Sequence, residues 1–121
     1  MAKKILIADD EEMIRDVVKL ALKNEGYEIY EAKDGVEALN VAKDIKPDLV
    51  LLDVTMPGKV GYIVSQELKD NPDTKHAYII FITARGSKAE DAAMDSGGDE
   101  TISKPFDIVK LRERVRNALK G

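Results

Sequence analysis

Five side chains that can do chemistry each close a short apolar run of this sequence: Asp9, Asp10, Asp53, Thr83 and Lys104. A carboxylate at the end of a buried strand costs stability unless a cation or a hydrogen-bond donor compensates it. Carboxylates about 5 Å apart repel by roughly 3 kcal/mol per pair at an effective dielectric constant near 20. One lysine offsets part of this charge, and a hard divalent ion with oxygen ligands, Mg²⁺ or Mn²⁺, would offset the rest.

The same set of groups suits phosphoryl transfer. A carboxylate can act as a nucleophile and form an aspartyl phosphate, and a bound divalent ion offsets the charge of the phosphoryl group. The Thr83 hydroxyl would then donate a hydrogen bond to a phosphoryl oxygen, and the Lys104 ammonium would contribute a positive point charge. Backbone N–H groups that follow Asp53 and Thr83 would complete the binding site.

Composition excludes several other classes of protein. With 121 residues the chain is long enough for one domain with a proper core. Nineteen basic and 23 acidic residues give a net charge of −4, which argues against a nucleic-acid surface spread over the domain. There is no cysteine and a single histidine, so thiol catalysis and a multi-histidine zinc site are excluded and a metal would need oxygen ligands.

Hydrophobic patterning predicts alternating strands and helices. Apolar runs predict strands at residues 5–8, 27–32, 49–52, 78–82 and 101–103. Apolar residues at helical spacing predict helices that contain residues 14–22, 36–45, 64–68, 89–94 and 108–119. Glu11 and Glu12 open the first helix and Gly26 closes it, while Pro47 stops the second and Asn71 with Pro72 ends the third.

Five strand–helix pairs predict an α/β fold of the (βα)5 type, a doubly wound, five-stranded parallel sheet in a three-layer sandwich. Two strand orders suit this pattern, the flavodoxin-like order 2-1-3-4-5 and a half-Rossmann order, and periodicity does not separate them. In the flavodoxin-like order the four strands that end in the chemical groups are contiguous. Those groups would then converge at the carboxyl edge of the sheet, where α/β proteins bind ligands.

The motifs together resemble the receiver domain of two-component response regulators, over essentially residues 1–121 as one domain. The resemblance is carried by Asp9-Asp10, by Asp53 followed by Met56-Pro57 and Gly61, by Thr83-Ala84, and by Lys104-Pro105-Phe106. It implies the flavodoxin-like strand order. It also implies a module that is switched by phosphorylation and catalyses only its own phosphorylation and dephosphorylation, not the reaction of a separate substrate.

The resemblance implies a role for each site residue. Asp53 would accept the phosphoryl group from a sensor histidine kinase or a phosphotransfer protein. Mg²⁺ would be held directly by Asp10, Asp53 and the backbone carbonyl of Thr55, and by Asp9 through water.

Further implied roles concern the phosphoryl oxygens and the response to them. Lys104, Thr83 and the backbone of Ala84 would bind these oxygens, and the Lys104–Pro105 peptide bond would be cis. Thr83 is one switch position of the family, and its hydroxyl would move toward the phosphate.

Two features depart from the family pattern. Receivers usually carry Tyr or Phe at the second switch position, where this chain has Thr101, so rotation of an aromatic ring on that strand is not expected. The loop after Asp53 carries Lys59-Val60 in place of Met-Asp. Thr55 and Arg85 occupy positions that would modulate the site, and Arg85→Ala is expected to change the lifetime of the aspartyl phosphate.

Other interpretations stay open at this point. Asp9 or Asp10 could simply cap the first helix, because Asp is a good N-cap residue. A degenerate receiver would keep the fold and act by phosphorylation-independent protein contact, an alternative that Thr101 favours. A phosphatase or phosphotransferase with an Asp53 nucleophile is less well supported, since position 55 is Thr and the Asp-x-Asp pair of such enzymes is absent.

The expected partners follow from the same reasoning. Besides the phosphodonor, a downstream protein would bind the face formed by the helix at 89–94, the strand at 101–103 and the helix at 108–119. The basic residues of that last helix predict a solvated face or a docking surface. No apolar stretch approaches the ~20 residues that span a bilayer, so no membrane contact is expected. The absence of cysteine fits a cytoplasmic protein, and the net charge of −4 predicts no direct binding of nucleic acid by this domain.

Overall fold

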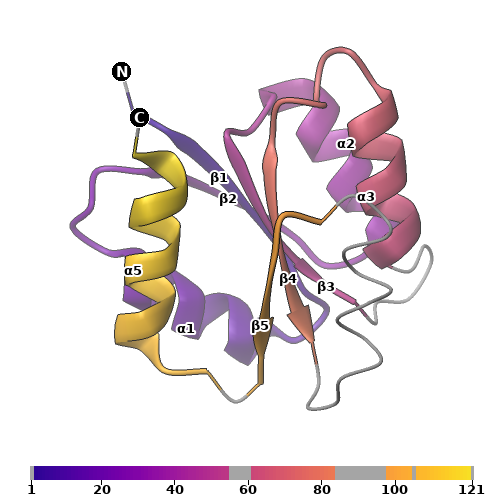
Figure 1. Cartoon of the computed structure of the whole chain (residues 1–121). Helices are drawn as coiled ribbons and strands as arrows, with labels where there is room; N and C mark the ends of the chain where they lie inside the picture. Colours follow the sequence, from indigo (N-terminus) through magenta and orange to yellow (C-terminus); the bar gives the residue numbers. More distant parts are fainter. Residues whose placement is uncertain (1, 55–60, 84–97, 105, 121) are drawn as a thin grey trace.

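A five-stranded parallel sheet forms the centre of the protein (Figure 1), whose computed structural model describes residues 2–54, 61–83, 98–104 and 106–120. The strand order is β2-β1-β3-β4-β5, so the flavodoxin-like order is confirmed and the half-Rossmann order is wrong. The strands are β1 (Lys4–Ala8), β2 (Glu28–Ala32), β3 (Leu49–Asp53), β4 (Tyr78–Thr83) and β5 (Glu100–Ser103). All four strand pairs are parallel.

The described helices cover both faces of this sheet. They are α1 (Glu12–Leu22), α2 (Gly35–Ile45), α3 (Gly61–Asp70) and α5 (Ile108–Leu119). Figure 1 shows α1 and α5 side by side on one face and α2 and α3 on the other. The helix predicted at residues 89–94 lies outside the described residues. No helix in the described part of the chain is long and apolar enough to cross a membrane.

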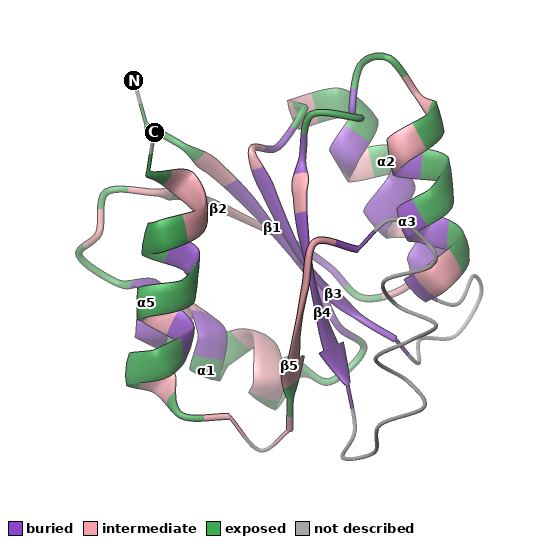
Figure 2. Ribbon diagram, in the orientation of Figure 1, coloured by how far each residue is buried: buried purple, intermediate pink, exposed green. Residues whose placement is uncertain are grey.

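The sheet separates two hydrophobic cores, because successive strand residues point to opposite faces. On β3, Val50 and Leu52 pack in the core beneath α2 and α3, while Leu49 and Leu51 pack in the core beneath α1 and α5. Every residue of β3 is buried (Figure 2). This explains the uninterrupted apolar run that the sequence shows before Asp53, since a strand covered on both faces needs apolar residues at every position.

The ends of the helices show how the chain enters and leaves the site. The N-cap residue of α1 is Glu11, whose side chain makes no capping hydrogen bond. Neither Asp9 nor Asp10 is therefore the N-cap residue, and that interpretation is wrong. The helix ends at Leu22, before the predicted stop at Gly26, whose φ of 83° lies in the following loop. In contrast, α2 has a side-chain cap, because Asp34 accepts a hydrogen bond from the backbone N–H of Glu37.

Candidate functional site

The register of the sheet aligns the predicted site residues at its carboxyl edge. Ala8 of β1 pairs with Leu52 of β3, which places Asp9 and Asp53 next to each other at the strand ends. Thr83, the last residue of β4, pairs with Ser103 of β5. Lys104 follows directly, and its backbone N–H donates a hydrogen bond to the Thr83 carbonyl at 2.7 Å. The prediction that these residues converge is therefore confirmed.

Three carboxylates form the centre of the site. Asp9, Asp10 and Asp53 each offer one oxygen, and these three oxygens lie within 4.8 Å of one another. Asp9 is fully buried and Asp53 is 3% exposed, whereas Asp10 is exposed. Two of the three charges are therefore held away from water, where their mutual repulsion is screened least.

The ammonium group of Lys104 partly neutralises this cluster. Its Nζ atom lies 3.2 Å from Oδ2 of Asp9 and 3.7 Å from Oδ2 of Asp53. Burial alone would lower the pKa of Lys104, but the charges of the Asp53 and Asp9 carboxylates outweigh burial and raise this pKa above its usual 10.5. The lysine is thus a fixed cation, and three carboxylates against one ammonium leave the site with an excess of negative charge.

Two buried oxygens at this edge have no hydrogen-bond donor among the described residues. They are Oδ2 of Asp9, which has only the ion pair with Lys104, and the hydroxyl oxygen of Thr83. Leaving a buried hydroxyl without a hydrogen bond costs roughly 1–3 kcal/mol, and this cost applies to Thr83, whereas Oδ2 of Asp9 keeps the Lys104 ammonium at 3.2 Å. Oxygen atoms in this state, beside uncompensated negative charge, fit a hard divalent cation together with an anionic ligand that accepts from Thr83.

A glycine fixes the path of the chain beneath Asp53. A Cβ atom at Gly61, the first residue of α3, would lie 2.4 Å from the backbone oxygen of Asp53. The backbone N–H of Gly61 also donates a hydrogen bond to the Val54 carbonyl at 3.0 Å. Only glycine allows α3 to begin this close to β3, which explains the physical need for the glycine in the motif.

Several predicted site features lie outside the described residues. They are the backbone carbonyl of Thr55, the backbone of Ala84, the side chain of Arg85, the Lys104–Pro105 peptide bond and the Lys59-Val60 departure.

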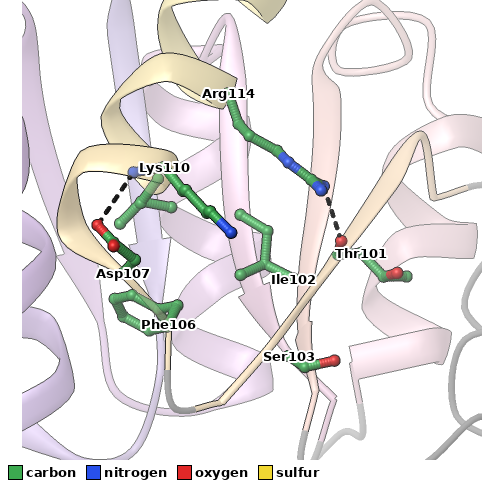
Figure 3. A pocket seen from close by; sticks show the side chains of 8 residues that line it. Thr101, Ile102, Ser103, Phe106, Asp107, Lys110 and Arg114 are labelled. Carbon is green, nitrogen blue, oxygen red and sulfur yellow. Dashed lines mark hydrogen bonds between the residues drawn. The ribbon is translucent and has the colours of Figure 1, made fainter.

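Thr101 lies in the middle of β5 and is half-buried. It pairs with Phe81 of β4, and its carbonyl accepts a hydrogen bond from Nη1 of Arg114 at 3.1 Å. The threonine lines a pocket of about 380 Å³ between β5 and α5 (Figure 3). Apolar side chains of Ile102, Phe106 and Leu111 contribute to this pocket, and Lys110 and Arg114 add positive charge. The pocket lies outside the cluster of carboxylates.

All three arginines of α5 contact other parts of the chain. Arg112 donates a hydrogen bond to the Ala21 carbonyl of α1 at 2.7 Å, and Arg116 pairs with Glu25 at 2.7 Å. Arg114 pairs with Glu100 at 3.1 Å. The predicted solvated face thus also makes contacts from α5 to α1, to the loop that follows α1 and to β5. These distant partners have no local signature in the sequence.

Arg15 is a residue at the site that the sequence analysis missed. Its Nη1 atom donates a hydrogen bond to the backbone oxygen of Asp9 at 2.8 Å, and its Nε atom pairs with Glu31 of β2 at 3.0 Å. In the sequence it is one of several charged residues on the first helix. Its position six residues after Asp9 gave no indication that it turns back toward the strand end.

Comparison with known proteins agrees with this geometry. A family model of the response regulator receiver domain matches residues 5–116. A predicted response regulator from Chloroflexus aurantiacus is 33% identical, the match covers 100% of both chains, and the TM-score is 0.94. The chemotaxis response regulator CheY4 of Vibrio cholerae is 28% identical, with 98% of this chain and 100% of that chain covered and a TM-score of 0.91.

A third solved structure is the receiver domain of a signal transduction histidine kinase from Syntrophus aciditrophicus. It is 30% identical, with 99% of this chain and 92% of that chain covered and a TM-score of 0.90. Receiver domains bind a divalent metal at an acidic cluster, and Asp9, Asp10 and Asp53 form such a cluster here. From its sequence match, its fold and this acidic site, the chain belongs to the response regulator receiver domains of two-component systems.

Proposed function

We propose that this protein, as one receiver domain over residues 1–121, accepts a phosphoryl group on Asp53 from a sensor histidine kinase or a phosphotransfer protein. The observation that supports this most is the composition of the site. Three carboxylate oxygens lie within 4.8 Å of one another, a lysine ammonium lies 3.7 Å from Asp53, and the buried Thr83 hydroxyl is without a hydrogen-bond partner in the described part of the chain.

Mg²⁺, or Mn²⁺ in its place, is the metal that we propose for the cluster. Asp10 and Asp53 would ligate it directly, Asp9 would do so through water, and the backbone carbonyl of Thr55 would supply a further ligand. All of these are oxygen donors, the kind that these ions prefer. When bound, the ion would offset negative charge on the phosphoryl oxygens during transfer.

In the proposed step a carboxylate oxygen of Asp53 forms a bond to phosphorus while the bond from phosphorus to the donor's histidine nitrogen breaks. The electron pair of that bond leaves with the imidazole nitrogen. Lys104 would shift from its carboxylate partners toward a phosphoryl oxygen, and Thr83 and the backbone N–H of Ala84 would donate hydrogen bonds to the others. Phosphoryl transfer needs mainly positioning and charge compensation, which these groups provide.

An exposed apolar stripe on α1 offers a contact surface for the phosphodonor. Met13, Val17 and Leu20 follow helical spacing and are 77%, 37% and 60% exposed. The stripe begins three residues after Asp10 in the chain, so a helix that brings a phosphohistidine to Asp53 could pack against it. Exposed apolar side chains grouped in this way are typical of protein docking surfaces.

The proposed output is a change of the surface around β5 and α5, together with the helix predicted at residues 89–94. A phosphoryl group that draws the Thr83 hydroxyl inward would act on β5 directly, since Thr83 pairs with Ser103 and accepts a hydrogen bond from Lys104. A downstream protein would bind this face in the cytoplasm. The domain would catalyse only its own phosphorylation and dephosphorylation.

A degenerate receiver is the second candidate function, and Thr101 is the observation that favours it. Described residues of β5 include no aromatic side chain, and the hydrogen bond from Arg114 holds the backbone at Thr101 against α5. A protein of this kind would keep the fold and signal by constitutive contact, without a phosphorylated state.

Intact mass spectrometry after incubation with acetyl phosphate and Mg²⁺ tests the two candidates. The phosphoacceptor predicts a mass increase of one phosphoryl group that is lost in Asp53→Asn and when EDTA replaces Mg²⁺. Asp48→Asn is a matched control, because Asp48 precedes β3 at the end opposite the site and accepts a hydrogen bond from the Lys4 N–H. No mass increase in the unaltered protein would refute the phosphoacceptor and favour the degenerate receiver.

A further inference from the structure

Arg15 connects the first strand end, the first helix and the second strand. Its side chain is only 14% exposed, which is unusual for an arginine on a surface helix. One end of the guanidinium donates a hydrogen bond to the backbone oxygen of Asp9 at 2.8 Å, and its Nε atom pairs with the Glu31 carboxylate at 3.0 Å. Lys19, one turn further along α1, also pairs with Glu31 at 3.0 Å but does not contact Asp9.

The hydrogen bond from Arg15 is one of three hydrogen bonds that hold Asp9 in place. The Asp9 N–H donates to the Ala32 carbonyl at 3.1 Å, and Oδ1 of Asp9 accepts from the Glu11 N–H at 2.9 Å. The Asp9 carbonyl belongs to the peptide group that joins Asp9 to Asp10. Arg15 therefore restricts the rotation of that peptide group, which sets the direction in which the Asp10 side chain leaves the backbone.

Asp10 depends on this restraint more than the two buried carboxylates do. It is the exposed member of the cluster, and in the described ranges no donor forms a hydrogen bond with its carboxylate. Asp9 is instead held by burial, by Glu11 and by Lys104. The position of the Asp10 carboxylate is therefore set mainly by its own backbone, and Arg15 holds that backbone in place.

We propose that Arg15 is a positioning residue for the metal site, which orients Asp10 through the backbone of Asp9 and is itself anchored by Glu31. This inference rests on the proposed function, because it requires that the acidic cluster binds a divalent metal. Residues that orient metal ligands without touching the metal typically change affinity by 10–100-fold when they are replaced. We expect the smaller effect here, about tenfold weaker Mg²⁺ binding in Arg15→Met.

Electrostatics alone predicts the opposite sign. Arg15 carries a positive charge close to the cluster, and a positive charge repels Mg²⁺. Removal of that charge with no change in geometry would therefore strengthen Mg²⁺ binding. A positioning role predicts weaker binding although the net charge becomes more favourable, so the direction of the change distinguishes the two explanations.

Lys19→Met is the matched control. It removes the same charge from the same Glu31 cluster and leaves the contact with Asp9 intact. We expect its Mg²⁺ affinity to be unchanged or slightly increased. Arg15→Lys keeps the positive charge but loses the planar guanidinium that contacts both the Asp9 carbonyl and the Glu31 carboxylate. We therefore expect a Mg²⁺ affinity between those of the unaltered protein and Arg15→Met.

Isothermal titration calorimetry with MgCl₂, at one pH and ionic strength, measures these affinities, and the amide resonances of residues 9–11 report the local geometry in parallel. Weaker binding in Arg15→Met, partial recovery in Arg15→Lys and no loss in Lys19→Met would support the proposal. Should Arg15→Met not fold, Arg15→Lys, which keeps the positive charge and alters only the contacts with Asp9 and Glu31, must weaken Mg²⁺ binding for the proposal to stand.

Each contrary result has a distinct meaning. Unchanged or tighter binding in Arg15→Met would overturn the role of Arg15 and leave the proposed function intact. An equal loss in Arg15→Met and Lys19→Met would also overturn it, because a general effect of the charge cluster would then account for both. If the unaltered protein did not bind Mg²⁺, the proposed function and this inference would fail together.

Discussion

Replacing Asp10 with Asn should stabilise the metal-free protein, although Asp10 is a predicted metal ligand. The reason is the repulsion among the three carboxylates of the site. Lys104 lies within ion-pair distance of Asp9 and Asp53, and no such pair with Asp10 occurs among the described residues. The substitution to Asn therefore removes two repulsive interactions and keeps the attractive ones, and it preserves the size of the side chain.

The distances give the magnitude. At a separation of 4.8 Å, the upper limit for the three oxygens, each pair repels by about 0.9 kcal/mol even at the dielectric constant of water. Two pairs give about 1.7 kcal/mol, because Asp10 is repelled by both other carboxylates. Asp10 also lies at the N-terminus of α1, where loss of its charge costs up to ~1 kcal/mol. The net gain is about 1 kcal/mol, or an increase of ~4 °C in the unfolding midpoint.

Mg²⁺ should remove this advantage. A ligand at a hundredfold its dissociation constant stabilises the folded state by about 2.7 kcal/mol, and a variant with tenfold weaker binding gains only about 1.4 kcal/mol. The stabilities of the two proteins should therefore become nearly equal at that Mg²⁺ concentration. Without Mg²⁺, Asp10→Asn should be the more stable protein.

Urea unfolding followed by circular dichroism, in EDTA and in MgCl₂ at low ionic strength, measures both effects. Asp16→Asn is the control, since Asp16 is an exposed carboxylate of the same helix that pairs with Lys19. A lower free energy of unfolding for Asp10→Asn in EDTA would refute the repulsion argument. An unchanged response to Mg²⁺ would instead refute Asp10 as a ligand.

Three further predictions concern other parts of the fold. Gly61→Ala should lower the free energy of unfolding by about 1–3 kcal/mol and weaken Mg²⁺ binding, because its Cβ would displace the Asp53 backbone; equal urea midpoints and affinities would contradict this. Partial burial alone raises the pKa of the Glu31 carboxyl, but its two basic partners on α1 outweigh burial and lower this pKa below 4.5. Its stabilising contribution should thus be present above pH 4.5 and be lost as the pH falls further, so urea unfolding of Glu31→Gln should lose less stability over that range than the unaltered protein does. Burial, together with the hydrogen bond to Glu100, raises the pKa of Tyr78 to about 12, so the tyrosinate absorbance step near that pH should disappear in Tyr78→Phe.

Much of this site was predictable from the sequence, because its residues occupy strand ends. Apolar runs mark strands, and the residue after each run marks the carboxyl edge of the sheet, so Asp9, Asp53, Thr83 and Lys104 were predicted to converge. Their convergence depends on strand order alone, which the combination of motifs supplied. A helix start at Asp9 or Asp10 was a reasonable alternative, but the N-cap residue is Glu11 and the Asp9 carboxylate pairs with Lys104 in the site.

Contacts of long, charged side chains were not predictable. Arg15 and Arg112 lie on amphipathic helices and resemble ordinary surface residues in the sequence. Their acceptors are backbone carbonyls of Asp9 and Ala21, and any residue has such a carbonyl, so neither pattern nor residue type identifies the pair. Gly61 was likewise recognisable in the sequence only as a motif glycine. The reason for it, the close approach of its backbone to the Asp53 carbonyl, depends on how α3 and β3 lie in the fold.

The pairing of α1 with α5 has a consequence for the order in which the protein folds. Arg112 and Arg116 reach partners 91 residues earlier in the chain, and Leu111 and Val115 cover the core on that face of the sheet. During synthesis β1, α1 and β3 leave the ribosome long before α5 exists. On one face of the sheet the apolar side chains that Leu111 and Val115 contact therefore stay uncovered until α5 is synthesised, whereas α2 and α3 are made earlier. Docking of α5 is then the step that covers this part of the core.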